Sequence, residues 1–408
     1  MGKRVTSIDI IRGLAILLMI FVNDLAGIEN LPKWLGHAPA GSDWMTFVDV
    51  VFPAFLFIVG ISLPFAIQAR LNRNQSYKEI GQHILIRVAG LVIIGVLMVN
   101  THHASDSYWL APELWTVLMY IGVIFTWNRI PGEKADTKLV ERVKKLKYIG
   151  IILLITLVFI FESQNQSGLI QLRTGWWGIL GLIGWAYLVA TLIYIPFRKH
   201  LSVIVFSIWL LYTFYFACQA GMLDNIPIIT DYFGPGFTFG THAAIILSGT
   251  VLGHIIKKYH FTNKRKCIKW SLLYSLGLLL SGIMLHQLSN LDKMFYLDKN
   301  LGTSVWGLIS SAFTIWAWLL VYYVIDILNY SKWTKLIRPA GMNPLFAYII
   351  APAIYSIIDL IFKITGGPNY YEVLAQNLYS GIVRSVIFAI FITWLTSFFK
   401  KKHIWLKL

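Results

Sequence analysis

Long apolar runs separated by short, basic loops constrain this sequence more than any other feature. A helix needs about 20 apolar residues to cross a bilayer, and about twelve runs approach or reach that length. They lie at residues 7–28, 46–68, 82–100, 113–129, 148–163, 176–197, 201–220, 239–257, 268–286, 304–328, 343–362 and 379–399. Apolar types make up 57% of the 408 residues and charged types only 13%, about half the charged share of an average soluble protein. We therefore predict an all-α, polytopic helical membrane protein.

The distribution of basic residues predicts the orientation of these helices. The net charge is +16, but Lys and Arg gather in short clusters after alternate apolar runs. Cytoplasmic loops are enriched in Lys and Arg, so both termini are predicted to be cytoplasmic, and nucleic acid is not expected as a partner. The first run is too long for a signal peptide and is interpreted as a retained helix. No loop is long enough for a soluble domain, so residues 1–408 are predicted to form a single transmembrane domain.

Polar side chains interrupt the first two apolar runs. Asp9 and Arg12 lie within the first run, Asn23 and Asp24 lie near its outer end, and Asp49 begins the second. A charge at the bilayer centre costs from about 2.5 kcal/mol upward, so such residues are usually buried in protein and functional. Asp9 and Arg12 are three residues apart and can pair on one helix face. A structural ion pair and a functional one are both consistent with this spacing.

His37 lies in the outer loop that connects these two runs. A helical hairpin returns the chain, so His37, Asn23 and Asp49 can converge at the outer membrane face. An imidazole can act as a base or a nucleophile, and a carboxylate or an amide can fix its tautomer. Spacing alone does not select His37, because other histidines also fall on the predicted outer side. These are His102, His103, His242 and His286.

Arg87 and a pair of histidines are further candidates for ligand contacts. Arg87 lies within the third run, where it can meet a phosphorylated ligand that enters from the cytoplasm. Snorkelling to the lipid headgroups is the alternative for this side chain. The pair His102-His103 lacks a second cluster of ligands, so no metal is predicted.

An ordered series of short motifs resembles the heparan-α-glucosaminide N-acetyltransferase family of transmembrane enzymes, which use acetyl-CoA. The series covers much of the chain and is specific as a set, whereas the Asp-x-x-Arg-Gly piece alone is shared with other membrane acyltransferases. The matching pieces are Ser7-x-Asp9-x-x-Arg12-Gly13, Phe21-Val22-Asn23, His37-Ala38, Asp49-Val50-Val51-Phe52-Pro53, Gly60, Gly240-Thr241, Lys299-Asn300-Leu301, Gly341-Met342-Asn343 and Trp405. A counterpart of the large N-terminal domain of the lysosomal members is not expected, and the chain is similar to a bacterial relative.

The resemblance implies transfer of an acetyl group across the membrane. Acetyl-CoA would bind from the cytoplasmic side, and its acetyl group would reach a glucosamine-like amino sugar on the outer face of a bacterial inner membrane. His37 matches the family's catalytic histidine, and Asn23 matches an asparagine beside the acetyl group. Asp49 would orient His37. Asp24 departs from the family pattern, which places an aromatic residue there, so its role stays open.

The remaining site predictions combine this resemblance with the positions of the polar residues along the chain. Arg12, Arg87 and Asn343 are assigned to acetyl-CoA, with the phosphates near the two arginines. Four residues of the outer loop before the tenth run are assigned to the acceptor substrate. They are Lys299, Asn300, Thr303 and Ser304. The resemblance also implies a homodimer.

Three questions stay open at this point. His37 can remove a proton from the attacking amine, or it can carry the acetyl group itself as an acetyl-histidine. The acceptor can be a hydroxyl of a surface glycan instead of an amine. A permease for a glycan or a small solute has the same topology, although the chain shows no inverted repeat of the transporter kind.

Overall fold

The structure is a computed structural model that describes residues 5–105, 108–131, 136–164, 168–402 and 404–408. Within these residues the chain is helical, and extended pairing is limited to two isolated bridges. The helices are α1 (Thr6–Leu25), α2 (Phe47–Leu71), α3 (Tyr77–Val99), α4 (Pro112–Trp127), α5 (Thr137–Ile160), α6 (Gly178–Phe197), α7 (Leu201–Gln219), α8 (Pro227–Phe233), α9 (Ala243–Tyr259), α10 (Lys264–His286), α11 (Ser304–Tyr322), α12 (Ile337–Met342), α13 (Pro344–Thr365), α14 (Tyr370–Val373) and α15 (Leu378–Lys401). The prediction of an all-α protein is confirmed.

In the part of the chain that the structure describes, nine helical segments are long and apolar enough to cross a membrane. They are Phe47–Leu71, Tyr77–His102, Gly178–Phe197, Leu201–Gln219, Gly236–Tyr259, Lys264–His286, Ser304–Ile327, Pro344–Thr365 and Leu378–Lys401. The other three predicted spans are also helical. They correspond to the polar-interrupted α1, the short α4 and the basic α5. The protein is thus an integral membrane protein, while the count of twelve and the cytoplasmic termini stay predictions.

The helices form two compact units, and the unit boundary falls within α1 and α3. The first unit contains Met1–Ala15, Pro32–Val92 and Ile179–Trp333. The second contains Ile16–Leu31, Ile93–Gly178 and Thr334–Leu408. Each unit is described by itself below.

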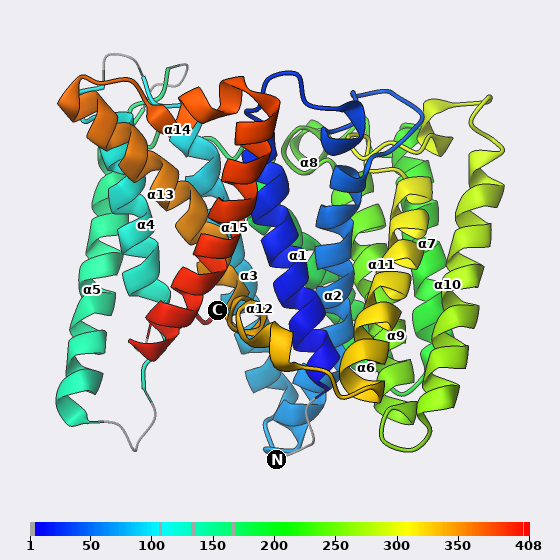
Figure 1. Ribbon diagram of the computed structural model, residues 1–408. Coiled ribbons are helices and arrows are strands. Elements are labelled where there is room, and N and C mark those ends of the chain that lie inside the picture. Colours follow the sequence, from blue (N-terminus) through cyan, green and yellow to red (C-terminus); the bar gives the residue numbers. More distant parts are fainter. Residues whose placement is uncertain (1–4, 106–107, 132–135, 165–167, 403) are drawn as a thin grey trace. The chain divides into compact units, whose positions relative to one another are not determined.

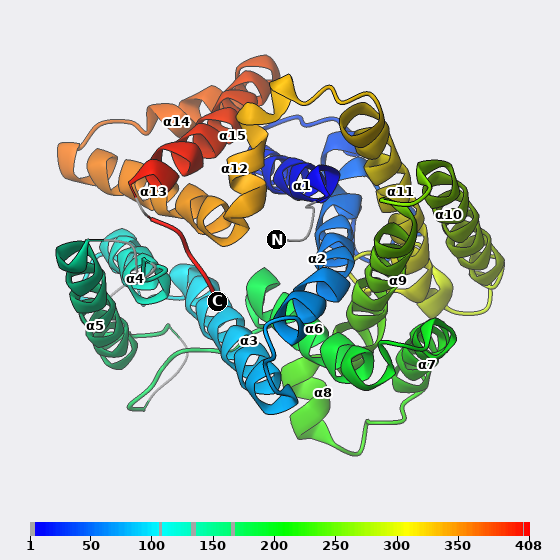
Figure 2. The same ribbon diagram turned by 90° about the horizontal axis from the view of Figure 1, so that it is seen from below.

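The first unit is centred on the contact between α2 and α9. A Cβ atom at Gly60 of α2 would lie 1.9 Å from the carbonyl oxygen of Ile246, and one at Gly249 of α9 would lie 1.9 Å from that of Phe57. Only glycine allows the two backbones to approach this closely, which is a common way of packing helices in membranes. Helices α7, α10 and α11 complete the group around α9 (Figure 2). As a result, 89% of the apolar stretch that includes α9 is buried, against 22% for α10.

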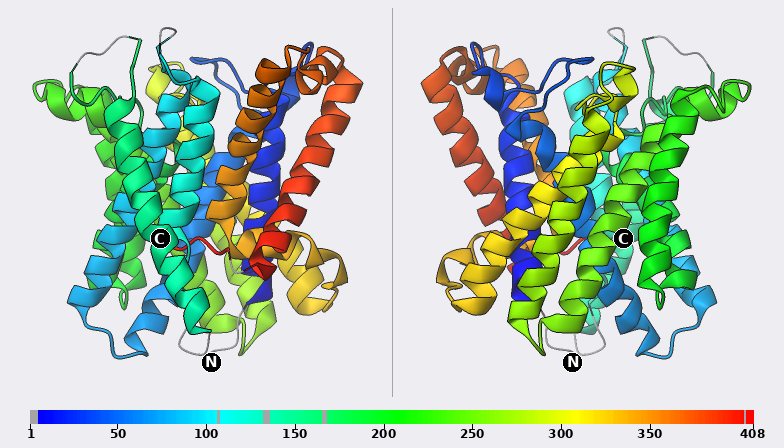
Figure 3. Two further views of the ribbon diagram at one scale, coloured as in Figure 1. Left: turned by 90° about the vertical axis from the view of Figure 1, so that its left-hand side faces the viewer. Right: turned by 90° about the vertical axis from the view of Figure 1, so that its right-hand side faces the viewer.

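Two loops of the first unit lie at the same end of its helices, above α2 and α11 (Figure 3). One is the segment from Pro32 to the start of α2, and the other joins α10 to α11. Backbone N–H groups bind them together, because Gly41 donates to Asp298 at 2.7 Å and Leu297 donates to Asp43 at 2.8 Å. This end of the unit carries the first group of candidate site residues.

The second unit packs α4 against α5 and α13, and α15 against α12 and α13 (Figure 1). Its C-terminal tail is held by hydrogen bonds to the end of α4. Arg129 donates its backbone N–H to Trp405 at 2.7 Å, and Trp405 donates its own to the side chain of Asn128 at 2.9 Å. The short helix α14 caps α13 and α15 at the opposite end from this tail (Figure 1).

Candidate active site

The carboxylate of Asp49 is fixed by the residues at the start of α2. Asp49 lies in the first turn of the helix, and its Oδ2 atom accepts hydrogen bonds from the backbone N–H of Thr46 at 3.0 Å and from that of Ala38 at 3.1 Å. The Thr46 hydroxyl donates to the same oxygen at 3.1 Å. A helix-capping interaction of this kind ties the first turn to the preceding loop. The other carboxylate oxygen, Oδ1, is thereby aimed at His37.

The Nδ1 atom of His37 lies 2.7 Å from that oxygen, which accepts its hydrogen bond. The imidazole is therefore assigned the tautomer in which Nδ1 donates and Nε2 keeps its lone pair. The His37 side chain is 45% exposed, whereas that of Asp49 is 1% exposed. A buried carboxylate thus orients an accessible imidazole, the arrangement found behind many general bases.

Lys299 reaches the same pair from the loop between α10 and α11. Its Nζ atom lies 2.9 Å from Nδ1 and 3.3 Å from Nε2 of His37, and 3.7 Å from Oδ1 of Asp49. Burial lowers the pKa of Lys299, and the nearby Asp49 partly opposes this by favouring the ammonium form. The three side chains form one cluster, which we call the His37 cluster.

The loop that carries Lys299 is built around Asp298. The carboxylate of Asp298 accepts the backbone N–H of Asn300 at 2.6 Å and of Leu301 at 3.2 Å, in addition to that of Gly41. The Asn300 side chain donates to the carbonyl of Ala38 at 3.3 Å. Asp298 is not among the residues predicted from the sequence. Its signal is the short Asp-Lys-Asn segment, since Asp side chains often accept from the backbone two or three residues ahead in tight turns.

Thr303 and Ser304 form the start of α11 and are fully buried. The Thr303 hydroxyl accepts from the backbone of Trp306 at 3.2 Å and donates to the carbonyl of Tyr296 at 2.7 Å. The indole of Trp306 then donates to the carbonyl of Asp49 at 3.0 Å. Thr303 therefore helps to position the His37 cluster, and acceptor binding by Thr303 and Ser304 stays a prediction.

The residues predicted for acetyl-CoA have protein partners in the structure. Arg12 lies 3.6 Å from Asp9, as its spacing predicted, and its guanidinium also donates to Ser62. The guanidinium of Arg87 lies over the ring of Tyr187, 4.7 Å from its centroid.

Asn343, in the second unit, lies between α12 and α13 and contacts the C-terminal tail. Its side-chain oxygen accepts from the backbone of Leu406 at 3.2 Å, and its amide donates to the carbonyl of Ile404 at 3.5 Å. Acetyl-CoA contacts of this residue stay a prediction, as do those of the two arginines.

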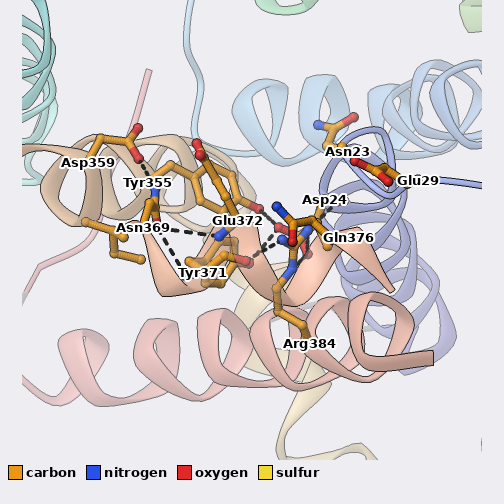
Figure 4. A pocket seen from close by; sticks show the side chains of 13 residues that line it. Asn23, Asp24, Glu29, Tyr355, Asp359, Asn369, Tyr371, Glu372, Gln376 and Arg384 are labelled. Carbon is orange, nitrogen blue, oxygen red and sulfur yellow. Dashed lines mark hydrogen bonds and ion pairs between the residues drawn. The ribbon is translucent and has the colours of Figure 1, made fainter. Parts of the chain in front are cut away.

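Asp24, whose role the sequence left open, is the centre of a buried network in the second unit. One of its oxygens, Oδ2, lies 3.2 Å from Nε and Nη2 of Arg384 and accepts from the hydroxyl of Ser385 at 2.5 Å. The other, Oδ1, accepts from Tyr355 at 2.7 Å and from Tyr371 at 2.6 Å. Figure 4 shows Tyr355, Tyr371 and Arg384 converging on Asp24 at the end of α1. The partners come from residues more than 300 positions away, so no local pattern could reveal them.

This network borders a cavity of about 460 Å³. Asn23, the predicted partner of the acetyl group, lines the cavity next to Asp24 and is exposed. The lining is polar, with amide, carboxylate and tyrosine side chains (Figure 4). Among the residues that the structure describes, no three His, Cys, Asp or Glu side chains are grouped so as to hold a metal ion.

The fold and the His37 cluster define a class of protein, namely an integral membrane protein with a carboxylate-oriented histidine at the loop end of a helical unit. The chain belongs to the family described as "Domain of unknown function (DUF5009)", whose sequence model matches residues 4–255.

Two curated proteins are similar to the chain over most of its length. Heparan-alpha-glucosaminide N-acetyltransferase of Mus musculus is 23% identical over 461 aligned residues, which cover 99% of this chain and 60% of the mouse protein. The protein of the same name from Homo sapiens is 24% identical over 403 residues, which cover 92% of this chain and 57% of the human protein. The chain thus spans somewhat more than half the length of these relatives, and the resemblance to their family is confirmed.

Proposed function

We propose that this protein is an acetyltransferase that moves an acetyl group from cytoplasmic acetyl-CoA to a glucosamine-like amino sugar on the outer face of a bacterial inner membrane. The His37 cluster is the observation that carries the proposal. An accessible imidazole oriented by a buried carboxylate supplies the base that acyl transfer to an amine requires. The similarity to two N-acetyltransferases supports the donor and the acceptor class.

In this proposal, His37 acts through Nε2. The acceptor nitrogen attacks the thioester carbonyl, and Nε2 takes the proton that the nitrogen loses. The C–S bond then breaks, CoA leaves as a thiolate, and the proton held by the imidazolium is given up to it, which restores the neutral His37. Asp49 accepts from Nδ1–H throughout and stabilises the imidazolium, which is the part that a buried carboxylate plays beside a catalytic histidine.

Lys299 has a second task in the same step. Its ammonium lies 3.3 Å from Nε2 of His37, next to the place where the reacting carbonyl would sit. Negative charge develops on that carbonyl oxygen in the transition state, and a fixed cation beside it lowers the barrier by a few kcal/mol in comparable sites. The location of Lys299 therefore supports donation to the oxyanion as well as the predicted contact with substrate.

The other predicted site residues contact acetyl-CoA. Asn23, which the resemblance places beside the acetyl group, donates a hydrogen bond to the developing oxyanion. Arg12 and Arg87 bind phosphate groups of acetyl-CoA, for which guanidinium groups are well suited, and Asn343 binds the same molecule. An acetyl-His37 intermediate is the alternative to this direct transfer, and a homodimer is what the resemblance implies.

The experiment that tests the proposal uses purified protein in detergent with labelled acetyl-CoA and glucosamine. We expect labelled N-acetylglucosamine to form. Transfer to glycans without an amine, with none to glucosamine, would redirect the proposal to O-acetylation. Protein reconstituted in proteoliposomes distinguishes an acetyltransferase from a permease. Uptake of glucosamine in the absence of acetyl-CoA, with no acetyl transfer when acetyl-CoA is added, would contradict the acetyltransferase.

A further inference from the structure

The cavity of the second unit has no task in the proton transfer assigned to His37. Its volume of about 460 Å³ lies within the range of about 300–1,000 Å³ that is typical of small-molecule sites. It is formed by the end of α1, by α13 and α15, and by the segment around α14 (Figure 4). The charge and the hydrogen-bonding groups of its lining determine which ligand the cavity would select.

The charge of the lining is negative. Four carboxylates and one guanidinium line the cavity, which leaves a formal charge of −3 in a chain of net charge +16. Arg384, the single cation, is engaged by Asp24 through its Nε and Nη2 atoms and by the carbonyl of Tyr371 through Nη1, at 2.7 Å. The carboxylates that remain are those of Glu29, Asp359 and Glu372. These carboxylates would repel an incoming anion and would attract a cation.

The carboxylates are spread around the cavity and alternate with amides. Figure 4 shows Asp359 and Glu29 on opposite sides, with Gln376 and Asn23 near Glu29. Asp359 accepts from the side chain of Asn369 at 2.8 Å, so its position is fixed. Hydrogen-bonding groups distributed in this way suit a ligand with several polar substituents, because each substituent can find its own partner.

We propose that this cavity binds a sugar that carries a free, protonated amine. The ammonium group faces the carboxylates of Glu29 and Glu372, and the sugar hydroxyls exchange hydrogen bonds with the amide of Gln376. The inference rests on the proposed function for the choice of an amino sugar as ligand, and it names the side chains of the second unit that distinguish an amine from a hydroxyl.

The test measures equilibrium binding to the full chain in detergent, without acetyl-CoA, so that transfer is not needed for the readout. Glucosamine is titrated against glucose and N-acetylglucosamine, which differ from it only at the amine. We expect glucosamine to bind at least tenfold more tightly than either sugar. The double variant Glu29→Gln/Glu372→Gln should lose at least tenfold in glucosamine affinity and should keep its affinity for glucose. Higher salt should weaken glucosamine binding, because these carboxylates are accessible to solvent.

Glu141→Gln is the matched control, since it removes an exposed carboxylate of the same unit that does not line the cavity. This variant should bind glucosamine like the wild type. Equal affinities for glucosamine and glucose, no binding of either, or unchanged glucosamine affinity in the double variant would each overturn the inference. Selective glucosamine binding without acetyl transfer would uphold the cavity and refute the proposed function. Acetyl transfer with an unchanged KM for glucosamine in the double variant would uphold the proposed function and refute the assignment of the cavity.

Discussion

Replacing Arg384 with methionine should destabilise the protein strongly, because it removes one partner of a buried ion pair. Both side chains are nearly inaccessible, with 7% of Arg384 and 2% of Asp24 exposed. Breaking such a pair from one side typically costs about 3–5 kcal/mol, since the remaining charge stays buried without its partner. The hydroxyls of Ser385, Tyr355 and Tyr371 still donate to Asp24, so we expect the lower end, about 3 kcal/mol, or roughly a hundredfold in the unfolding equilibrium.

The assay is unfolding of the purified protein in mixed detergent micelles, followed by intrinsic tryptophan fluorescence. The double variant Asp24→Asn/Arg384→Met removes both charges and should be more stable than Arg384→Met alone by about 1–2 kcal/mol, a coupling within the range measured for contacting residues.

Lys363→Met provides the matched control, because it breaks an ion pair of the same unit in which 55% of Lys363 and 26% of Glu113 are exposed. Pairs of this kind contribute about 0–1 kcal/mol. The reasoning is refuted if Arg384→Met costs no more than this control, or if the double variant is as unstable as the single one.

Three further predictions concern the His37 cluster and the helix packing. Asp49→Asn should lower acetyl transfer by about a hundredfold or more while acetyl-CoA binding is unchanged, because an amide cannot stabilise the imidazolium of His37. Burial lowers the pKa of Lys299, so its positive charge is present at low pH and is lost as the pH rises through a pKa below the usual lysine range. Wild-type transfer should decline there, and Lys299→Arg should move the decline to higher pH. Gly60→Ala should destabilise the protein by several kcal/mol, because its Cβ would lie 1.9 Å from a backbone oxygen of α9, whereas Gly81→Ala, with open space around it, should be neutral or stabilising by up to about 1 kcal/mol.

Each of these predictions has a clear contrary result. Full activity in the Asp49→Asn variant would remove the orienting role of the carboxylate. An alkaline limb that is the same in Lys299→Arg and the wild type would show that another group causes the decline. Equal stability of the Gly60 and Gly81 variants in the unfolding assay would contradict the close packing of α2 on α9.

The helical architecture could be predicted because hydropathy is a local property. The predicted spans at 201–220 and 379–399 correspond to Leu201–Gln219 and Leu378–Lys401. The largest difference is α5, which starts at Thr137 instead of residue 148. A span predicted from hydropathy ends where Lys and Arg residues begin. The helix itself continues through these basic residues, because Lys and Arg are good helix formers.

The site was predictable only where its residues are close in sequence. Asp9 and Arg12 are three positions apart, and a short loop brings His37 to Asp49. By contrast, Lys299 is 262 positions from His37, and Arg384 is 360 positions from Asp24. Such contacts depend on how the helices pack, and the sequence pattern holds no periodic signal for them. The sequence therefore predicts only a substrate contact for Lys299 and no role for Asp24.

The most direct test of the central claim compares acetyl transfer by three proteins: the wild type, His37→Ala and His286→Ala. His286 is a matched control, because it is also a partly exposed histidine of the first unit paired with an aspartate, Asp43, at 2.9 Å. We predict that labelled acetyl transfer to glucosamine falls by at least a hundredfold in His37→Ala, with acetyl-CoA binding retained, and stays within a few-fold of wild type in His286→Ala. Undiminished transfer by His37→Ala would contradict the account.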